Sequence, residues 1–330
     1  MNNSWFKPSD LYWALAWFVA KLYFTMAPIP VLMRGAKLKG LFHALTSKKR
    51  ELAKKNLISM WGDSWAEKQI NAVVRRHFEY LETVKLIKHL PQSKGFANPA
   101  CWPAEGLQYL EESLAQGKGT ILVSAHFGYG RLIEDLLALR GYRLRVVHPG
   151  SNKMSKLEKR RKKQIKGYTA FAQFMSRRLQ PRRGLAQREE LYAEFNARPL
   201  VTALKQNEVL FIVADGLYAM KFVELDFLGR PMPFPTGFIS IALATGATVL
   251  PIFAVDSSEG FGIKVIIEQP LLPDKKNAPA RSLTGDSVEK FARLVESYVT
   301  RYPHLYGMVT DERGFEGKLA RSRRGVAERY

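Results

Sequence analysis

The pattern of apolar and polar positions is clearest around residue 126. Residues 120–124 are mostly apolar and predict a buried strand, which the glycines at 128 and 130 bring to an end. Leucines at 132, 136 and 139 then recur at helical spacing and predict a helix over 132–140. His126 therefore lies on a turn between a strand and a helix. Parallel sheets carry active sites at such turns, where a helix N-terminus offers free N–H groups. The alternative is a histidine with a purely structural role.

The same alternation of strands and helices continues through the second half of the chain. It predicts helices over 106–115 and 238–245 and further strands over 144–148, 209–214, 248–255 and 262–268. Strands that alternate with helices are typical of a mostly parallel sheet covered by helices. We therefore expect an α/β domain over residues 105–310.

The N-terminal pattern is different, because residues 11–33 form the most apolar stretch and Lys21 is their only charge. Lys21 lies near the middle, and Pro28 and Pro30 break the second half, so the pattern favours an interfacial helix or a short anchor over a clean span. Aromatic residues in this stretch suit a position at the level of the lipid headgroups. We assign residues 1–33 to membrane attachment; a buried core helix is the alternative.

Residues 34–55 contain eight basic residues and one acidic residue, and helical spacing continues to about residue 90. We expect a helical basic section over 34–104 that faces the cytoplasm and touches anionic lipid, and a basic tail over 311–330.

The composition indicates the charge of the expected binding partners. The chain has 330 residues, 46% of them hydrophobic, and 51 Lys and Arg against 30 Asp and Glu give a net charge of +21. Such a charge favours nucleic acid, an acidic membrane, or an acidic protein or phosphate-bearing substrate.

Twelve basic residues lie within 151–183, inside the α/β pattern and with few aromatic neighbours. An anionic substrate or membrane is favoured there over a solvated helix face, and we expect no nucleic-acid partner. The single cysteine, Cys101, excludes an internal disulfide and a multi-cysteine metal site.

Several short motifs, in their order and spacing, resemble the bacterial lipid A biosynthesis (lauroyl/myristoyl) acyltransferases of the lysophospholipid acyltransferase superfamily. The resemblance covers about residues 11–310, and the motifs that carry it lie at 51–57, 74–78, 124–128, 215–216, 227–231, 235–237 and 247–253. It implies a glycerol-3-phosphate acyltransferase-like fold and an enzyme at the cytoplasmic face of the inner membrane.

The implied reaction moves a fatty acyl group from acyl carrier protein or coenzyme A to a hydroxyl or amine of a lipid, glycolipid or related acceptor, with His126 as general base. We expect no metal and no cofactor. The alternative is a non-catalytic relative that binds acyl chains, acyl carrier protein or anionic membrane.

The chain departs from the family at one position. The family has Asp or Glu five residues after the histidine, and Arg131 stands there in this chain. Glu134 is one candidate replacement, although eight residues of helix span about 12 Å. Asp215 is the better one, because it ends a predicted strand, precedes a glycine and matches an acidic-Gly pair of the superfamily; a turn or helix cap is its alternative role. Substrate-binding cations are predicted at Arg131, Arg177, Arg178 and Arg230.

Overall fold

The computed structural model of the chain describes most of the helical and α/β sections. The described residues are 11–12, 14–15, 18–19, 22–23, 26–87, 98, 101–149, 188–193, 196–215, 221–272 and 280–312.

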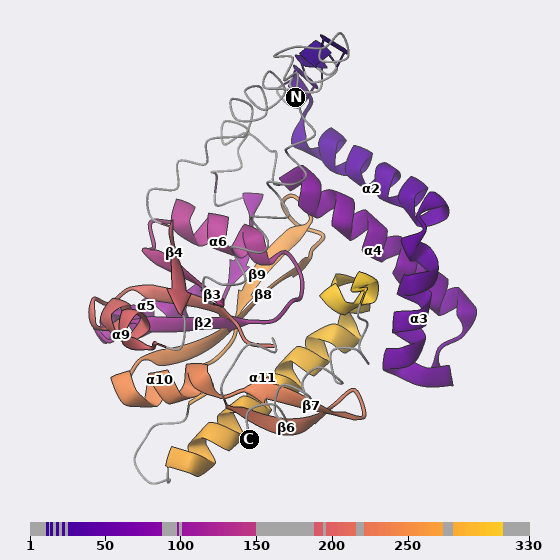
Figure 1. The fold of residues 1–330 in the computed structure, drawn as a ribbon. Helices are drawn as coiled ribbons and strands as arrows, with labels where there is room; N and C mark the ends of the chain where they lie inside the picture. The colour runs from indigo at the N-terminus through magenta and orange to yellow at the C-terminus, as the bar shows by residue number, and fades with distance from the viewer. Residues whose placement is uncertain are drawn as a thin grey trace, which may run out of the picture.

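A seven-stranded sheet forms the centre of the molecule (Figure 1). Its strand order is β1-β9-β8-β2-β5-β3-β4. The five strands from β8 to β4 are parallel, β9 is antiparallel to β8, and β1 is parallel to β9. The predicted α/β class with a mostly parallel sheet is thereby confirmed. The strands are β1 (Ala104–Glu105), β2 (Thr120–Ser124), β3 (Leu144–Pro149), β4 (Arg188–Ala193), β5 (Val209–Val213), β8 (Thr248–Asp256) and β9 (Ile263–Ile267).

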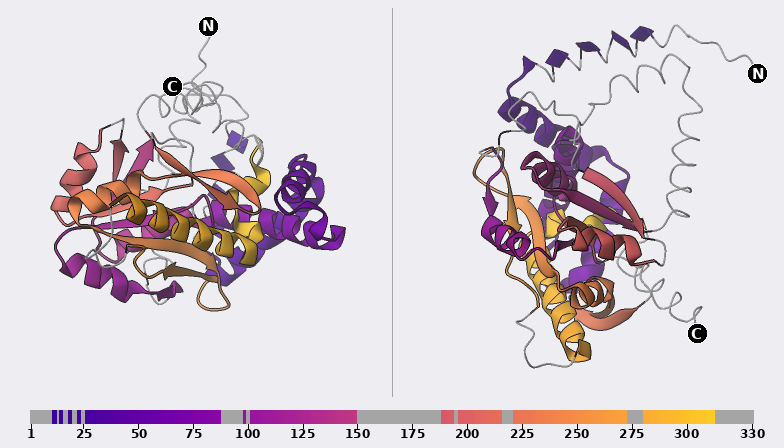
Figure 2. Two further views of the ribbon diagram at one scale, coloured as in Figure 1. Left: turned by 90° about the horizontal axis from the view of Figure 1, so that it is seen from below. Right: turned by 90° about the vertical axis from the view of Figure 1, so that its left-hand side faces the viewer.

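Helices cover both faces of this sheet. The crossover from β2 to β3 and the crossover from β5 to β8 run in opposite directions along the sheet, so right-handed connections place α6 and α10 on opposite faces (Figure 2). Helix α10 packs against both α9 and α11, which puts these three in one layer. The helices of this part are α5 (Leu107–Ala115), α6 (Gly130–Leu139), α9 (Arg198–Lys205), α10 (Gly237–Thr245) and α11 (Ala280–Arg301).

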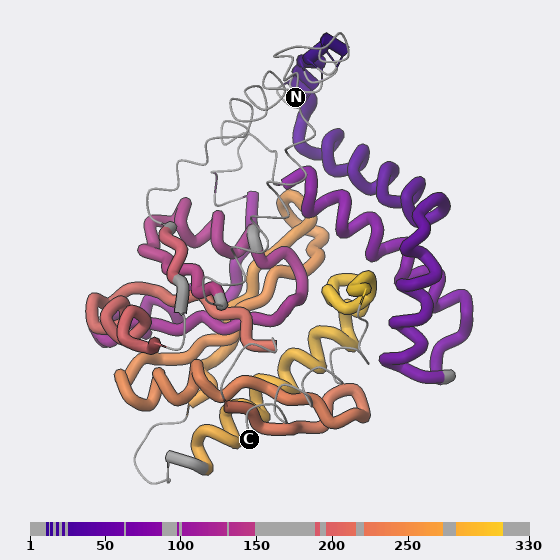
Figure 3. Tube along the Cα trace, in the orientation of Figure 1, coloured from indigo at the N-terminus to yellow at the C-terminus, as the bar shows by residue number. Residues whose placement is uncertain are grey.

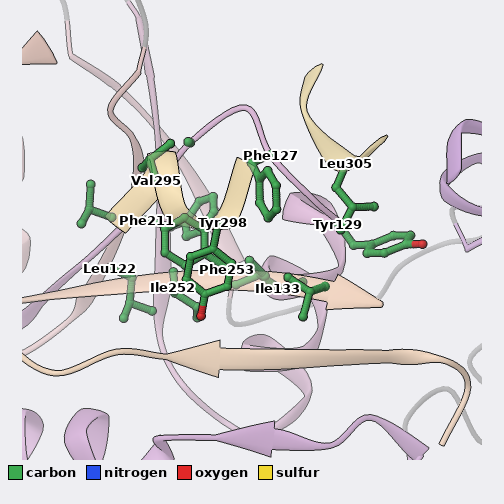
Figure 4. Close-up of a cluster of buried hydrophobic side chains, with 14 of the residues drawn as sticks. Leu122, Phe127, Tyr129, Ile133, Phe211, Ile252, Phe253, Val295, Tyr298 and Leu305 are labelled. Carbon is green, nitrogen blue, oxygen red and sulfur yellow. The ribbon is translucent and has the colours of Figure 1, made fainter. Parts of the chain in front are cut away.

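Aromatic packing joins the sheet to α11 next to residue 126. The ring of Phe253 on β8 stacks on Tyr298 of α11 at a centroid distance of 4.2 Å (Figure 4). Phe127 meets both rings edge-on, at 6.0 and 5.9 Å. Phe127 and Phe253 are almost fully buried, and aromatic pairs in these arrangements stabilise by about 0.5–1.5 kcal/mol each beyond the area they bury. The residue that follows His126 is therefore fixed in the core.

A separate hairpin, β6 (Phe222–Phe227) and β7 (Arg230–Pro235), lies beside α11. Its phenylalanines turn inward: Phe227 and Phe234 are fully buried and contact each other at 5.5 Å. The apolar face of the hairpin thus extends the core beyond the main sheet.

Three N-terminal helices lie together at one side of the molecule (Figure 3). They are α2 (Ile29–Thr46), α3 (Lys49–Trp61) and α4 (Glu67–Ile87), with a short 3₁₀ turn η1 (Gly62–Ser64) before α4. Helix α2 packs along α4 so closely that a Cβ on Gly40 would lie 2.4 Å from the Cα of Glu79. Only glycine allows two helix backbones to approach to this degree.

An ion-pair cluster fixes the same two helices. The buried carboxylate of Glu82 on α4 lies 3.0 Å from Lys39 Nζ and 3.0 Å from His43 Nδ1 of α2, and it also pairs with Lys85. Burial alone would raise the pKa of Glu82, but the hydrogen bonds and charges of Lys85 and Lys39 outweigh it and lower that pKa to about 2. Glu82 therefore stays ionised and joins α2 to α4.

The N-terminal helices also bind the C-terminal end of the described chain. Asn56 Nδ2 of α3 lies 3.1 Å from each of the carbonyl oxygens of Met308, Val309 and Asp311. These residues belong to or follow the 3₁₀ turns η4 (Pro303–Leu305) and η5 (Gly307–Thr310) after α11. Segments that are far apart in the sequence, α3 and the turns after α11, are thus in direct contact (Figures 1 and 2).

Apolar side chains point away from the protein along the N-terminal section. On α2 they recur at helical spacing, as Val31, Leu38, Leu41, Phe42 and Leu45, and Leu38 is 68% exposed. The described residues before α2 continue the pattern with exposed Leu11, Leu15, Phe18, Leu22 and Met26. Among the helices that the structure describes, none combines the length and the apolar character needed to cross a membrane. Most of the predicted attachment segment 1–33 lies outside the described residues.

Candidate active site

Two strands bring His126 and Asp215 together. Strands β2 and β5 are neighbours in parallel register, with Ser124 opposite Val213, and the amide of Ala214 donates to the carbonyl of Ser124 at 2.8 Å. Each of the two residues therefore lies just beyond the carboxyl end of its strand. The distance from His126 Nδ1 to Asp215 Oδ1 is 2.5 Å.

The two partners differ in exposure. The His126 side chain is 59% exposed, whereas that of Asp215 is fully buried. Because a carboxylate only accepts, the Nδ1 of His126 carries the hydrogen of this bond, and in the neutral ring Nε2 holds the lone pair. Such a ring can take a proton at Nε2 while the carboxylate fixes its orientation and stabilises the charge formed.

Backbone contacts hold the turn that carries His126. Gly128 has a φ of +63°, and a Cβ there would lie 2.0 Å from the carbonyl oxygen of Ala254 on β8. The amide of Gly128 donates to the carbonyl of Leu305 at 2.9 Å, and the amide of Gly307 donates to that of His126 at 2.8 Å. The turn is thus confined between β8 and the segment that follows α11.

Tyr306 lies between these backbone bonds, paired with Phe127 in an isolated antiparallel bridge. Its side chain is fully buried, and its hydroxyl has no hydrogen-bond partner among the residues that the structure describes. Burial raises the pKa of Tyr306 well above its ordinary value, and the charge of Asp215 raises it further. The hydroxyl therefore stays protonated near Asp215, at the edge of the sheet that carries His126. No motif pointed to Tyr306, because its position depends on pairing across almost 180 residues.

A histidine on α4 supports the same segment from the other side. His77 is buried, its Nδ1 lies 2.7 Å from the carbonyl oxygen of His304, and its Nε2 lies 3.0 Å from Thr310 Oγ1. Nδ1 therefore donates and Nε2 accepts, which is the arrangement of a neutral ring. Burial lowers the pKa of His77 to about 4, against the opposing effect of the bond to His304.

We expect the free energy of unfolding to fall as the pH drops from about 6.5 to about 4. In that window the unfolded chain binds a proton at His77 and the folded chain does not, and a difference of this size corresponds to about 3 kcal/mol. Urea unfolding at a series of pH values should show a shallower pH slope in His77→Gln than in the unchanged protein. Parallel slopes would contradict a neutral buried His77.

The remaining predicted site residues are placed as follows. Glu134 is buried on α6. Arg131 lies in the first turn of α6, so its place on the chain is next to the site, and Arg230 begins β7 with a partly buried side chain. Arg177 and Arg178 lie outside the described residues. Catalytic and substrate-binding roles for these residues stay predictions.

The described residues contain no group of three or more His, Cys, Asp or Glu side chains that could hold a metal ion. The expected absence of metals and cofactors stays a prediction.

In this α/β protein an exposed imidazole is bonded to a buried carboxylate at the carboxyl edge of a parallel sheet, an arrangement that can accept and return a proton. Comparison with known protein families identifies the family of this chain. The family model described as bacterial lipid A biosynthesis acyltransferase matches residues 6–311, and the chain belongs to this family. The resemblance inferred from the motifs is confirmed.

Curated relatives share a smaller part of the chain. The phosphatidylinositol mannoside acyltransferase of Mycobacterium tuberculosis (strain CDC 1551 / Oshkosh) is 28% identical over 99 residues, which are 30% of this chain and 30% of that protein. The protein of the same name from strain ATCC 25618 / H37Rv is 28% identical over 95 residues, 29% of each chain. The aligned part thus spans less than a third of either relative.

Proposed function

We propose that this protein transfers a fatty acyl group from a thioester to a hydroxyl or amine of a lipid or glycolipid, with His126 as general base. The contact between His126 and Asp215 carries the proposal, because it joins an exposed base to a buried acid. Family membership supports it, since the family is described by acyl transfer in lipid biosynthesis.

The proposed reaction needs no group outside the chain and its two substrates. His126 Nε2 accepts the proton of the acceptor as its oxygen or nitrogen attacks the thioester carbonyl. The new carbon–oxygen or carbon–nitrogen bond forms, the carbon–sulfur bond breaks, and the imidazolium returns the proton to the leaving thiolate. Asp215 stabilises the imidazolium between these steps.

Asp215 takes the role that the family gives to an acid five residues after the histidine. That position holds Arg131, a cation that cannot accept the hydrogen of Nδ1. We propose that Arg131 instead contributes, with Arg177, Arg178 and Arg230, to binding the anionic part of a substrate. The net charge of +21 suits an acidic donor, acyl carrier protein or coenzyme A, and a phosphate-bearing acceptor. The names of the curated relatives, which specify a mannose-containing lipid, favour a glycolipid acceptor.

We further propose that the exposed face of α2 binds the cytoplasmic surface of the inner membrane. Its apolar side chains Leu38, Leu41, Phe42 and Leu45 are flanked by the exposed cations Arg34 and Lys37. Apolar area combined with positive charge is the arrangement that binds anionic lipid surfaces.

The protein is expected to co-sediment with vesicles that contain anionic phospholipid. Serine at positions 38, 42 and 45 should weaken this partition roughly tenfold or more, because each apolar side chain contributes up to about 1.5–3 kcal/mol when it leaves water. These side chains are exposed, so the melting temperature should change little. Equal sedimentation of both proteins, or equal binding to neutral and anionic vesicles, would contradict membrane binding by α2.

Transfer itself is tested with radiolabelled acyl thioesters on acyl carrier protein and on coenzyme A, offered with a panel of lipids and glycolipids. Product formation with either donor supports the proposal and identifies the donor. Binding of acyl carrier protein or acyl chains without any turnover would replace the enzyme by a non-catalytic binding protein.

A further inference from the structure

A second carboxylate, Asp256, lies at the end of β8 on the side of β2 opposite to Asp215. Strand β8 pairs with β2 and β5 pairs with β2 on its other side, so both acids flank the strand that leads to His126. The Asp256 side chain is about one third exposed. It does not reach the imidazole in the described contacts; it binds the residues around it.

Both segments that confine His126 bind to this carboxylate. The hydroxyl of Tyr129 donates to Asp256 Oδ1 at 2.9 Å, and His304 Nε2 lies 2.7 Å from Asp256 Oδ2. Tyr129 is three residues after His126 and precedes α6, whereas His304 is three residues before Gly307, the residue whose amide binds the carbonyl of His126. Because Asp256 only accepts, Nε2 of His304 carries the hydrogen.

The donors are buried, which makes these bonds strong constraints. Tyr129 and His304 are 5% and 2% exposed. Burial raises the pKa of Tyr129 well above its ordinary value, and the charge of Asp256 raises it further, so the hydroxyl remains a donor. Burial raises the pKa of Asp256, but the hydrogen bonds of His304 and Tyr129 and the charge of Arg76 lower it overall. Hydrogen bonds to a charged acceptor contribute about twice as much as neutral ones.

Helix α4 completes the arrangement. Arg76 Nη2 lies 3.1 Å from Asp256 Oδ2, and the hydroxyl of Tyr80 donates to the carbonyl of Gly128 at 2.7 Å. The rings of Tyr80 and Tyr129 meet edge-on at 5.1 Å. The backbone bonds between the two segments pair them with each other, while Asp256 ties both of them, and α4, to a strand in the interior of the sheet.

We infer that Asp256 is a positioning residue of the proposed acyl transfer: through Tyr129 and His304 it holds the turn that carries His126 at the place where Nδ1 meets Asp215. The effect expected on kcat rests on the proposed function. The positioning role needs the charged carboxylate of Asp256, which accepts from Tyr129, His304 and Arg76 at once; an amide of the same size accepts through one oxygen only and has no charge to strengthen these bonds.

Asp256→Asn is expected to lower kcat per folded molecule about 100-fold, with the KM for the thioester within about twofold. A displacement of about 1 Å at a reacting group costs a factor of this order, and KM should stay similar because the inferred role of Asp256 acts through Tyr129 and His304. Tyr129→Phe, which removes one of the two bonds and keeps the ring, should lower kcat by an intermediate factor of about 10. The control is Glu105→Gln, which removes the ion pair with Lys264 at the far edge of the same sheet and should leave kcat unchanged.

A readout independent of turnover separates this inference from the proposed function. In ¹⁵N-histidine-labelled protein, the hydrogen between His126 Nδ1 and Asp215 gives a resonance far downfield, which His126→Gln removes and so identifies. Asp256→Asn and Tyr129→Phe should shift or broaden it, and Glu105→Gln should not. If the unchanged protein transfers no acyl group but its resonance responds in this way, the proposed function fails and the positioning role stands. Unchanged kcat and an unchanged resonance in both variants would overturn the positioning role, and if Asp256→Asn does not fold, Tyr129→Phe decides alone.

Discussion

Replacement of His126 by alanine is expected to reduce acyl transfer about 10³- to 10⁴-fold. The imidazole is the exposed member of the pair with Asp215, on the turn after β2. A positioned general base contributes a factor of up to about 10⁴. Transfer from radiolabelled acyl carrier protein and acyl coenzyme A measures the loss, and binding of the donor should change little because the ring is not needed for it.

His43→Gln is the matched control. His43 also has a carboxylate partner, Glu82 at 3.0 Å, but the pair lies between α2 and α4. Loss of the His43–Glu82 pair should leave the rate of acyl transfer in detergent solution within about twofold of that of the unchanged protein. A His126→Ala protein that retains full turnover would exclude the mechanism proposed above, whatever the identity of the acceptor.

Asp215→Asn is expected to lower kcat by about 10³- to 10⁴-fold while the fold is kept. The amide has the size of the carboxylate, but it carries no charge to stabilise the imidazolium, and its NH₂ group can hold the ring in the wrong tautomer. The carboxylate is fully buried beside Nδ1, so solvent does not replace its charge. Steady-state kinetics with saturating donor should show the loss in kcat and in kcat/KM alike.

Two further variants show which acid is used. Asp226→Asn removes a largely exposed carboxylate that pairs with Arg293 on α11, and it should leave kcat unchanged. Glu134→Gln tests the other predicted acid, on α6. If Asp215→Asn retains kcat within about tenfold and Glu134→Gln does not, the base is assisted by Glu134, and the contact seen between His126 and Asp215 is not the productive one.

The strands of the main sheet were predictable where burial makes them continuously apolar. Residues 120–124 are all buried and coincide with β2, and the predicted strand 248–255 differs from β8 by one residue. The hairpin of β6 and β7 gave no such signal. Its second strand has prolines at 231, 233 and 235, which pattern rules exclude from central strands, yet the hairpin stands alone and its prolines do not interrupt a ladder in the main sheet. The prediction also omitted α11, although its buried apolar positions 283, 288, 291, 292, 295, 298 and 299 recur at helical spacing.

The candidate site was also predictable only in part. His126 and Asp215 each follow a recognisable strand, so the edge on which they meet follows from the parallel sheet. The partners of Asp256 gave no local signal, because Arg76, Tyr129 and His304 come from α4, the start of α6 and the segment after α11. Their proximity depends on how the N-terminal helices pack against the C-terminal turns, which the hydrophobic pattern does not specify.

That packing sets the order in which the protein can mature during its synthesis. Asn56 is made 252 residues before the carbonyl of Met308 that it binds. At roughly 5–20 residues per second, Asn56 leaves the ribosome about 13 to 50 s before Met308 does. The backbone bonds from Leu305 and Gly307 reach the turn of His126 at the same late moment. The turn of His126 is therefore completed by almost the last residues of the described chain, and until they are made the nascent chain holds its histidine without the segment that confines it.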